Sequence, residues 1–262
     1  MLNDQEKNLL FSTVRIEITN SLSPGASVGT GFIVSVPVPG LVGSSYLFLV
    51  SNRHVFVDPA HQISLVFTKR QQGALEPSLG NVTGISQSGF LGGYVAHPDP
   101  SIDLACVNIS SFGEPTLGLY FRHYSHQHLI EDAPQALSVG QDVFFIGYPE
   151  NRFDVVHNLP LLRKGCIASA PNVDFNGKRQ FLIDAQVFQG SSGSPVFAAT
   201  GGEFKIAGVI SRTMIKNSVL QAVPVATASG IQQFIGLGIV LKVALLKELL
   251  NHAAQHFSAR AI

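Results

Sequence analysis

Residues 189–195 read QGSSGSP and lead directly into the apolar pair Val196 and Phe197. A serine hydroxyl becomes a useful nucleophile only when a positioned base takes its proton, and backbone N–H groups must face the oxyanion that develops. The glycines that flank Ser191 and Ser192 let the chain curl so that such N–H groups converge. The stretch therefore predicts a nucleophile turn that opens onto a strand, with Ser192 as the nucleophile. An ordinary Ser/Gly loop explains the same residues taken alone.

A histidine and a carboxylate stand at strand ends earlier in the chain. His54 is expected at the end of an apolar strand within residues 49–56, LVSNRHVF, and Asp103 precedes another apolar run. Each has a plainer explanation by itself, because His54 is one of nine histidines and an Asp before a strand often caps a turn. Asp99 is the rival carboxylate, but it lies between two prolines in a predicted turn, which favours Asp103. Asp103 follows His54 by 49 positions, and Ser192 follows Asp103 by a further 89.

The order His, Asp, Ser and the surrounding motifs resemble the trypsin-like serine peptidases, and most of all the bacterial trypsin-like and HtrA-type proteases. The same order separates the chain from subtilisins and α/β-hydrolases. The resembling motifs are GTGF at residues 29–32, NRHV at 52–55, DLA at 103–105, IGYP at 146–149 and DAQVFQGSSG at 184–193. Each motif is weak singly, but together they span nearly the whole chain in the family's order.

The resemblance implies an all-β, chymotrypsin-like fold of two packed antiparallel six-stranded β-barrels with a C-terminal α-helix. The expected units are residues 10–125, which carry His and Asp, residues 126–238, which carry Ser, and residues 239–262, which pack as a helix on the barrels. The active site is then expected in the cleft between the barrels.

The resemblance also implies the chemistry of a serine endopeptidase that cleaves protein or peptide substrates through an acyl-enzyme. His54 would act as general base, Asp103 would hold its imidazole, and the N–H groups of Gly190 and Ser192 would form the oxyanion hole. This chemistry needs no cofactor or metal, and it leaves room for a regulatory protein partner. A catalytically silent peptide-binding module on the same fold is the alternative, although no triad residue has been lost.

The chain departs from the family at several positions. Digestive and clotting proteases carry an Asp before the nucleophile that pairs with a newly cut N-terminus, and Ser191 stands there instead. Activation by that ion pair is therefore not expected. Ser194 replaces the family's second glycine. HtrA-type proteins carry a C-terminal PDZ domain, for which we expect no room after the helix.

The family pattern also suggests a specificity pocket. Its base would be Gln186 with Val187 beside it, and its wall would be Ile210, Ser211, Arg212 and Thr213. No carboxylate falls at the base to pair with Lys or Arg, and no histidine falls at the wall, where glutamyl endopeptidases have one. We therefore expect cleavage after uncharged residues. A preceding loop of different length would pack Gln186 away.

Composition sets the remaining expectations. The 262 residues are 45% hydrophobic and 13% charged, with 17 basic and 17 acidic side chains, which predicts a folded core and gives no reason to expect nucleic acid or a membrane as partner. Cys106 and Cys166 are too few for a disulfide framework and are expected to be reduced. The first residues do not resemble a signal peptide, so we expect a cytoplasmic protein.

Short strands with turn residues between them dominate the pattern. Val14 to Ile18 alternates with period two, and further strands are expected at residues 46–50, 63–68, 143–146, 181–183 and 204–210. The polar run RHYSHQH at residues 122–128 favours a surface connection over a metal site, because its histidines are irregularly spaced. From Val243 onward, an apolar residue at every third or fourth position predicts a docking helix that includes Leu246, Leu249, Leu250, Ala253 and Phe257. The alternative is that this helix binds a partner protein instead of packing on the core of its own chain.

Overall fold

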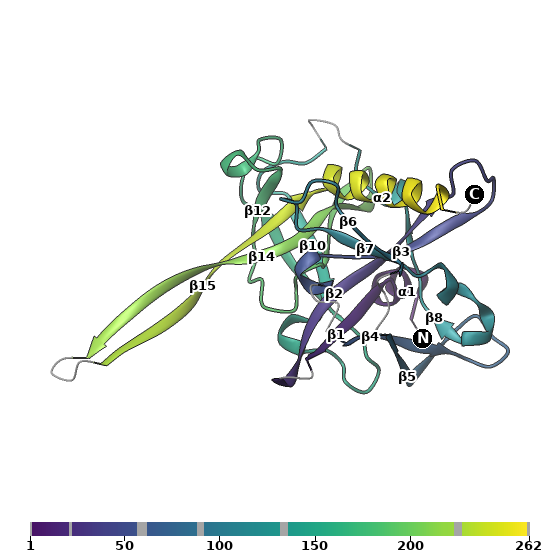
Figure 1. The fold of residues 1–262 in the computed structure, drawn as a ribbon. Coiled ribbons are helices and arrows are strands. Elements are labelled where there is room, and N and C mark those ends of the chain that lie inside the picture. Colours follow the sequence, from purple (N-terminus) through teal and green to yellow (C-terminus); the bar gives the residue numbers. More distant parts are fainter. Residues whose placement is uncertain are drawn as a thin grey trace.

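A computed structural model describes residues 2–20, 23–56, 62–87, 92–131, 136–222 and 227–260. Strands dominate, with one α-helix near each end of the chain (Figure 1). The helices are α1 (Asp4–Phe11) and α2 (Val243–Ser258). The strands are β1 (Thr13–Asn20), β2 (Ser23–Pro37), β3 (Ser45–Ser51), β4 (Gln62–Arg70), β5 (Pro77–Gln87), β6 (Tyr94–Ala96), β7 (Ala105–Asn108), β8 (Leu119–Tyr120), β9 (Tyr124–Ser125), β10 (Asp142–Gly147), β11 (Leu161–Ile167), β12 (Gln180–Asp184), β13 (Pro195–Thr200), β14 (Glu203–Ala222) and β15 (Thr227–Lys242).

The first half of the chain forms one sheet in the order β5-β4-β1-β2-β3-β7-β6, with β8 added to β4 and β9 added to β2. The period-two pattern in β1 is confirmed, because Val14 and Ile16 are buried while Arg15 and Glu17 are only half-buried. Ile16 belongs to a small core with residues of β3 and β4. β2 lies next to β1 and β3 and so carries the centre of this sheet.

This sheet differs from the expected six-stranded barrel. It has nine strands, and in the described residues its end strands β5 and β6 do not pair with one another. Alternating apolar residues mark a strand but not its partner, so closure depends on long-range pairing that the pattern does not carry. Two of the additional strands, β8 and β9, are only two residues long and come from the connecting segment.

The second half forms the closed six-stranded barrel that was expected, in the order β10-β11-β12-β15-β14-β13. Its interior is filled by large apolar side chains such as Phe145, Phe181 and Phe197, all at most 2% exposed. The all-β fold of two packed units is therefore confirmed, with one barrel closed and the other sheet open.

Strand β14 is far longer than the stretch that was expected at residues 204–210. It continues to Ala222 and pairs with β15, so that the two strands leave the body of the molecule as a projecting ribbon (Figure 1). Register shifts beside Arg212 and between Thr213 and Ile215 mark the base of this ribbon. Such β-bulges bend a strand and strengthen its twist.

The connection around residues 122–128 lies largely at the surface, as expected, but Tyr124 packs inward. Tyr124 is 6% exposed and its ring centroid lies 5.4 Å from that of Phe197. Burial also lowers the pKa of the nearby His123. The segment is packed because β9 adds to the sheet beside β2. In the described parts of the chain, no three His, Cys, Asp or Glu side chains gather as a metal site.

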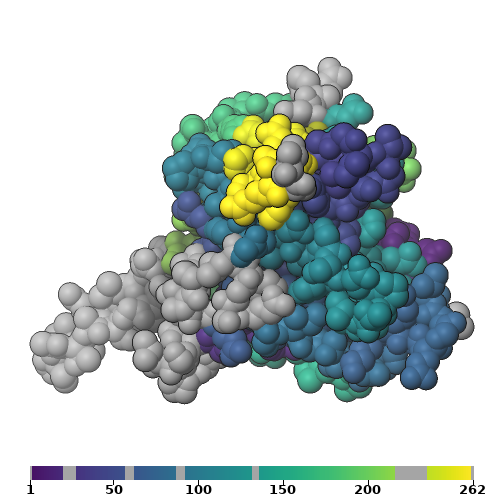
Figure 2. Space-filling model, turned by 45° about the vertical axis from the view of Figure 1, so that its right-hand side comes forward, coloured from purple at the N-terminus to yellow at the C-terminus, as the bar shows by residue number. Residues whose placement is uncertain are grey.

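The C-terminal helix docks on the core, as its apolar stripe predicts. In α2 the four residues Leu246, Leu249, Leu250 and Ala253 are at most 2% exposed, and the Phe257 ring lies 6.0 Å from Phe48. One face of the helix lies at the surface, beside the β2–β3 connection (Figure 2). Of the helices that the structure describes, none is long and apolar enough to cross a membrane.

Candidate active site

The nucleophile turn lies between β12 and β13 and depends on two glycines. Gly190 and Gly193 have φ angles of +84° and +86°, which side-chain-bearing residues rarely adopt. A Cβ atom would also overlap the Tyr148 carbonyl oxygen at Gly190 and the Thr30 carbonyl oxygen at Gly193. Both glycines are therefore required to bring Ser192 to the surface of the barrel.

Hydrogen bonds hold this turn against β14. The Gly193 N–H donates to the Ile210 carbonyl oxygen at 2.9 Å, and the Ile210 N–H donates to the Ser194 carbonyl oxygen at 2.9 Å. Ser191 and Ser194 are 1% and 0% exposed, whereas Ser192 is half-buried. Ser192 is thus the accessible hydroxyl of the three.

Thr30, at the centre of β2, joins the turn to the first sheet. Its Oγ1 donates to the Gly190 carbonyl oxygen at 2.6 Å and accepts from the Tyr148 N–H at 3.1 Å, while its N–H donates to the Ser192 carbonyl oxygen at 3.1 Å. The motif GTGF contained Thr30, but nothing in the sequence assigned it this role, because its partners lie more than a hundred positions away.

The predicted histidine and carboxylate meet at the edge of the first sheet. His54 lies in a short 3₁₀ helix (Arg53–Phe56) directly after β3, and Asp103 lies just before β7. The His54 Nδ1 is 2.7 Å from the Asp103 Oδ2, and the His54 N–H donates to the Asp103 Oδ1 at 3.1 Å. Asn52 Nδ2 donates to the Asp103 carbonyl oxygen at 2.8 Å and so fixes the loop. The contact between His54 Nδ1 and Asp103 Oδ2 restricts rotation of the imidazole.

Electrostatics keep Asp103 ionised. Burial would raise the pKa of Asp103, but the hydrogen bonds and charge of His54, with a smaller contribution from Arg212, outweigh it and hold that pKa below its usual range. The carboxylate is only 17% exposed, whereas the His54 side chain is 50% exposed. An ionised carboxylate at Nδ1 favours the tautomer in which Nε2 is free to accept a proton.

The rival carboxylate Asp99 has a different task. Its Oδ1 accepts from the N–H and the Oγ of Ser101, at 2.9 and 2.7 Å. These hydrogen bonds lower the pKa of Asp99 and commit it to its own turn. The preference for Asp103 as the partner of His54 therefore agrees with the contacts.

Ser211 in β14 contacts both sides of the site. Its carbonyl oxygen accepts from the Ser192 Oγ at 3.1 Å, and its own Oγ donates to the Asp103 Oδ2 at 3.5 Å. Among the described residues, Ser192 and His54 are not joined by a hydrogen bond. Catalytic hydrogen bonds are often long or misaligned when no substrate is bound.

Gly190 and Ser192 carry the two N–H groups that are expected to form an oxyanion hole. The Gln189 carbonyl oxygen accepts from the Glu150 N–H at 2.6 Å. In a trans peptide the carbonyl and the N–H point in opposite directions, so the Gly190 N–H is directed away from Glu150. No described group accepts a hydrogen bond from either Gly190 N or Ser192 N.

The residues expected to form a specificity pocket do not share one environment. Val187 and Ile210 are at most 1% exposed and belong to the barrel core, whereas Gln186 and Arg212 are exposed. The Thr213 Oγ1 donates to the Leu237 carbonyl oxygen at 3.4 Å, so it faces β15. Ser211 is buried beside the Asp103 carboxylate.

The sequence did not point to Arg163 of β11, which lies close to the predicted pocket base. Its guanidinium carbon is 4.9 Å from the centroid of the Phe188 ring and 5.7 Å from that of Phe145. Burial lowers the pKa of Arg163. Because Phe188 follows Val187 in the chain, a cation lies within reach of this loop.

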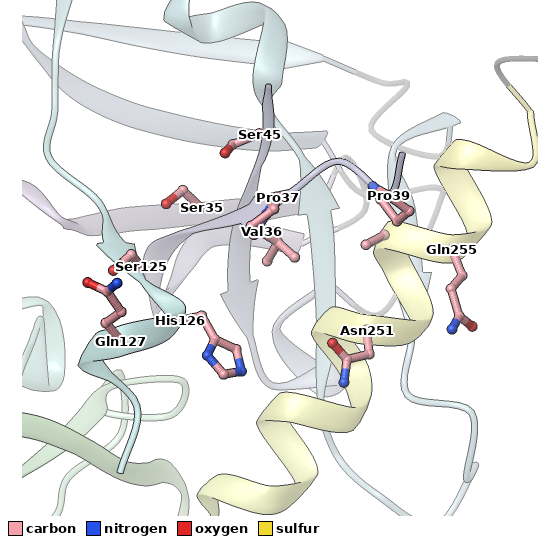
Figure 3. Close-up of a pocket in the computed structure, with 11 residues that line it drawn as sticks. Ser35, Val36, Pro37, Pro39, Ser45, Ser125, His126, Gln127, Asn251 and Gln255 are labelled. Carbon is pink, nitrogen blue, oxygen red and sulfur yellow. The ribbon is translucent and has the colours of Figure 1, made fainter. Parts of the chain in front are cut away.

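A separate pocket of about 610 Å³ lies between the far end of β2 and α2. Val36 and Pro37 form one wall, His126 and Gln127 another, and Asn251 of the helix faces them (Figure 3). Pro37 is seven residues from Thr30 along β2, roughly 23 Å at the usual rise of a strand. This pocket is therefore remote from His54 and Ser192.

Both cysteines are free thiols, as expected. Cys106 is buried, and burial raises the pKa of its thiol well above the usual range, while Cys166 is partly exposed.

Comparison with known protein families gives a match over about two thirds of the chain. A family model described as "Trypsin-like peptidase domain" matches residues 29–204, which include His54, Asp103 and Ser192. The chain therefore belongs to this family, in the class of trypsin-like serine proteases.

Solved structures show the same fold. One is an HtrA-type protease, AlgW, with a tripeptide: TM-score 0.53, 16% identity, 95% of this chain covered and 62% of that chain. Another is a thermostable serine protease, AL20, from an extremophilic microorganism: TM-score 0.52, 14% identity, 93% of this chain and 97% of that chain. The chain thus spans less than two thirds of the AlgW chain. A search of curated protein sequences finds no significant relative.

Proposed function

We propose that the chain is an active serine endopeptidase in which His54, Asp103 and Ser192 act together. The observation that carries the proposal is the 2.7 Å contact between His54 Nδ1 and Asp103 Oδ2, beside a nucleophile turn that other hydrogen bonds already hold in shape. Ser211 supports it, because this one residue contacts both the carboxylate and the Ser192 hydroxyl.

The reaction runs in two steps. Rotation of the Ser192 side chain takes its Oγ from the Ser211 carbonyl to His54, whose Nε2 accepts the proton as Oγ attacks the scissile carbonyl carbon. The N–H groups of Gly190 and Ser192 stabilise the oxyanion, and His54 then protonates the leaving amine. Water attacks the acyl-enzyme with His54 again as base, which releases the acid and restores the Ser192 hydroxyl.

We further propose that the residue before the scissile bond is uncharged. Neither Gln186 nor Val187 offers a carboxylate to a substrate Lys or Arg, and an unpaired charge in a closed pocket is strongly penalised. Arg163 is a cation close to this loop, and its stacking on Phe188 occupies one face of the guanidinium. A peptide library with every residue type at the scissile position tests this, and a dominant Glu signal would assign Arg163 to the pocket instead.

A fluorophosphonate probe tests the nucleophile, because only an activated serine reacts with it. The chain should be labelled once, at Ser192, and Ser192→Ala should abolish the label and lower kcat by on the order of 10⁶. Ser194→Ala is the matched control and should keep labelling, because Ser194 is fully buried and out of reach of the probe. Labelling of Ser192→Ala would assign the nucleophile to another residue.

The second candidate is a silent peptide-binding module. The observation in its favour is that Ser192 donates to Ser211 and not to His54 in the described structure. Absence of fluorophosphonate labelling, together with peptide binding that survives Ser192→Ala, would favour the peptide-binding module.

For either function we propose a cytoplasmic location, which the two unpaired thiols support. A regulatory protein partner is also proposed, since no ion pair of the zymogen type is available at Ser191.

A further inference from the structure

The connection between β6 and β7 carries the Asp103 carboxylate at one edge of the first sheet. It spans residues 97–104, and the His97 N–H closes it by donating to the Leu104 carbonyl oxygen at 3.0 Å. Its outer strand β6 is only three residues long. The position of Asp103 therefore depends on how firmly this short connection keeps its shape.

One buried side chain supports the connection from inside. The His97 side chain is 1% exposed, and its Nδ1 accepts a hydrogen bond from the Asp99 N–H at 3.0 Å. Burial lowers the pKa of His97, so its imidazole is neutral at neutral pH. A neutral imidazole carries one proton on nitrogen, and because Nδ1 accepts, this proton is on Nε2.

The Nε2 atom of His97 faces a carboxylate of the C-terminal helix. It lies 3.5 Å from the Glu248 Oε2, and it makes no hydrogen bond among the described residues. Glu248 is held by Arg179, whose guanidinium donates to both carboxylate oxygens at 2.6 and 2.7 Å. The helix α2 also packs against β7 (Figure 1). A negative charge at Nε2 favours the tautomer that keeps the proton there and leaves Nδ1 free to accept.

We propose that His97 is a positioning residue for catalysis: through Nδ1 it fixes the turn that places Asp103 against His54, and Glu248 of α2 maintains the tautomer that allows this. The proposal rests on the peptidase function above. Because His97 acts through Asp103, which orients the base, its loss should lower kcat and change KM little.

Two substitutions separate the two nitrogen atoms of the ring. His97→Asn keeps an acceptor at the position of Nδ1, and Asn side chains commonly accept from the N–H two residues further on. His97→Gln keeps a donor near the position of Nε2 but has no acceptor at Nδ1. Both substitutions leave part of the same buried site empty, so both should lower the free energy of unfolding.

The two variants should differ in turnover of a fluorogenic peptide with an uncharged residue before the leaving group. His97→Gln should lower kcat on the order of tenfold, with KM within about twofold of the parent value, whereas His97→Asn should keep kcat within about threefold. The matched control is His128→Gln. The His128 Nδ1 accepts from the Ser125 N–H at 3.0 Å, a contact of the same kind at another place in the chain, and its loss should leave kcat and KM unchanged.

Glu248→Ala leaves the imidazole in place and so tests the proposal even where a substitution at His97 does not fold. It should lower kcat about threefold without a change in KM, since the Nε2 proton loses the charge that favours it. Unchanged kcat in Glu248→Ala would overturn the role of the helix.

Hydrogen exchange of residues 97–106, followed by mass spectrometry, gives a measurement that does not depend on turnover. Exchange should be faster in His97→Gln than in His97→Asn, because only the Gln variant releases the Asp99 N–H.

Equal kcat in His97→Asn and His97→Gln would overturn the proposal, because the loss would then not follow the acceptor at Nδ1. A rise in KM with unchanged kcat would overturn it as well. Failure of the peptidase function is distinguishable, because the parent chain would then neither cleave the peptide nor react with the fluorophosphonate. In that case the exchange rates decide whether His97 holds the turn, and equal rates in the two variants would show that it does not.

Discussion

The nucleophile turn contacts β14 at Ile210, just before the β14–β15 ribbon leaves the barrel, but the turn and the ribbon are held by different contacts. The turn is bonded to three other elements: Thr30 of β2, Ile210 of β14, and the segment that carries Tyr148 and Glu150. The outer ribbon is held by the ladder between its own two strands. An isolated two-stranded ribbon is at best marginally stable in water, so this region should open locally far more easily than the turn.

The difference separates a rigid part of the molecule from a more mobile one. Chemistry needs groups held within a fraction of an ångström, which a densely bonded turn provides. Substitutions in the turn should therefore damage kcat or folding more than substitutions in the outer ribbon do.

The largest effect is expected at the base. His54→Ala should fold normally and lower kcat by on the order of 10⁶, because the histidine and the serine act as one unit. Turnover by His54→Ala at the rate of the parent chain would rule out histidine as the base.

Asp103→Asn should lower kcat by roughly 10⁴, because the amide no longer fixes the useful tautomer of His54. It also tests the electrostatics. The lowered pKa of folded Asp103 means that its ionised form stabilises the fold at neutral pH, and this contribution is lost as the pH falls below the ordinary carboxyl value of 3.8. Acid titration of unfolding by urea should show a smaller loss in the variant than in the parent. An equal loss would mean that Asp103 is not stabilised by His54.

Two glycine substitutions compare the turn with the base of the ribbon. Gly193 and Gly236 both have positive φ, at +86° and +78°, but only Gly193 faces backbone and side-chain atoms that a Cβ would overlap. Gly236→Ala should cost about 1–2 kcal/mol of stability from backbone strain alone. Gly193→Ala should cost roughly 3 kcal/mol or more and abolish activity. Thermal or urea unfolding measures both, and equal costs would mean that the turn is no more tightly packed than the base of the ribbon.

The smallest effect is expected at the link between the sheets. Thr30→Val removes the Oγ1 that bonds to Gly190 and Tyr148 and should cost about 1–3 kcal/mol of stability, with a fall in kcat of roughly 10-fold to 100-fold. Thr30→Ser keeps the hydroxyl and is the matched control. If Val and Ser behave alike in kcat, the hydrogen bonds of Thr30 do not position the oxyanion hole.

Much of the site could be predicted because its signals are local. The glycines around Ser192 mark a turn that only glycine can make, and the apolar runs before His54 and after Asp103 mark strand ends. The helix stripe from Leu246 to Ala253 needs only its own period. Other features were missed because they arise between distant segments: the nine-stranded sheet, the burial of Tyr124, the role of Thr30, and the length of the β14–β15 ribbon.

The sequence by itself determined which residue types are available for chemistry, where strands begin, and the order that identifies the family. Tertiary structure alone decided which carboxylate meets His54, since Asp99 and Asp103 are four positions apart and only their hydrogen bonds distinguish them. It also decided that β14 has an edge open beyond Ser211. The physical reason is the same in both cases: a propensity belongs to a few neighbouring residues, whereas a partner is chosen by the chain as a whole.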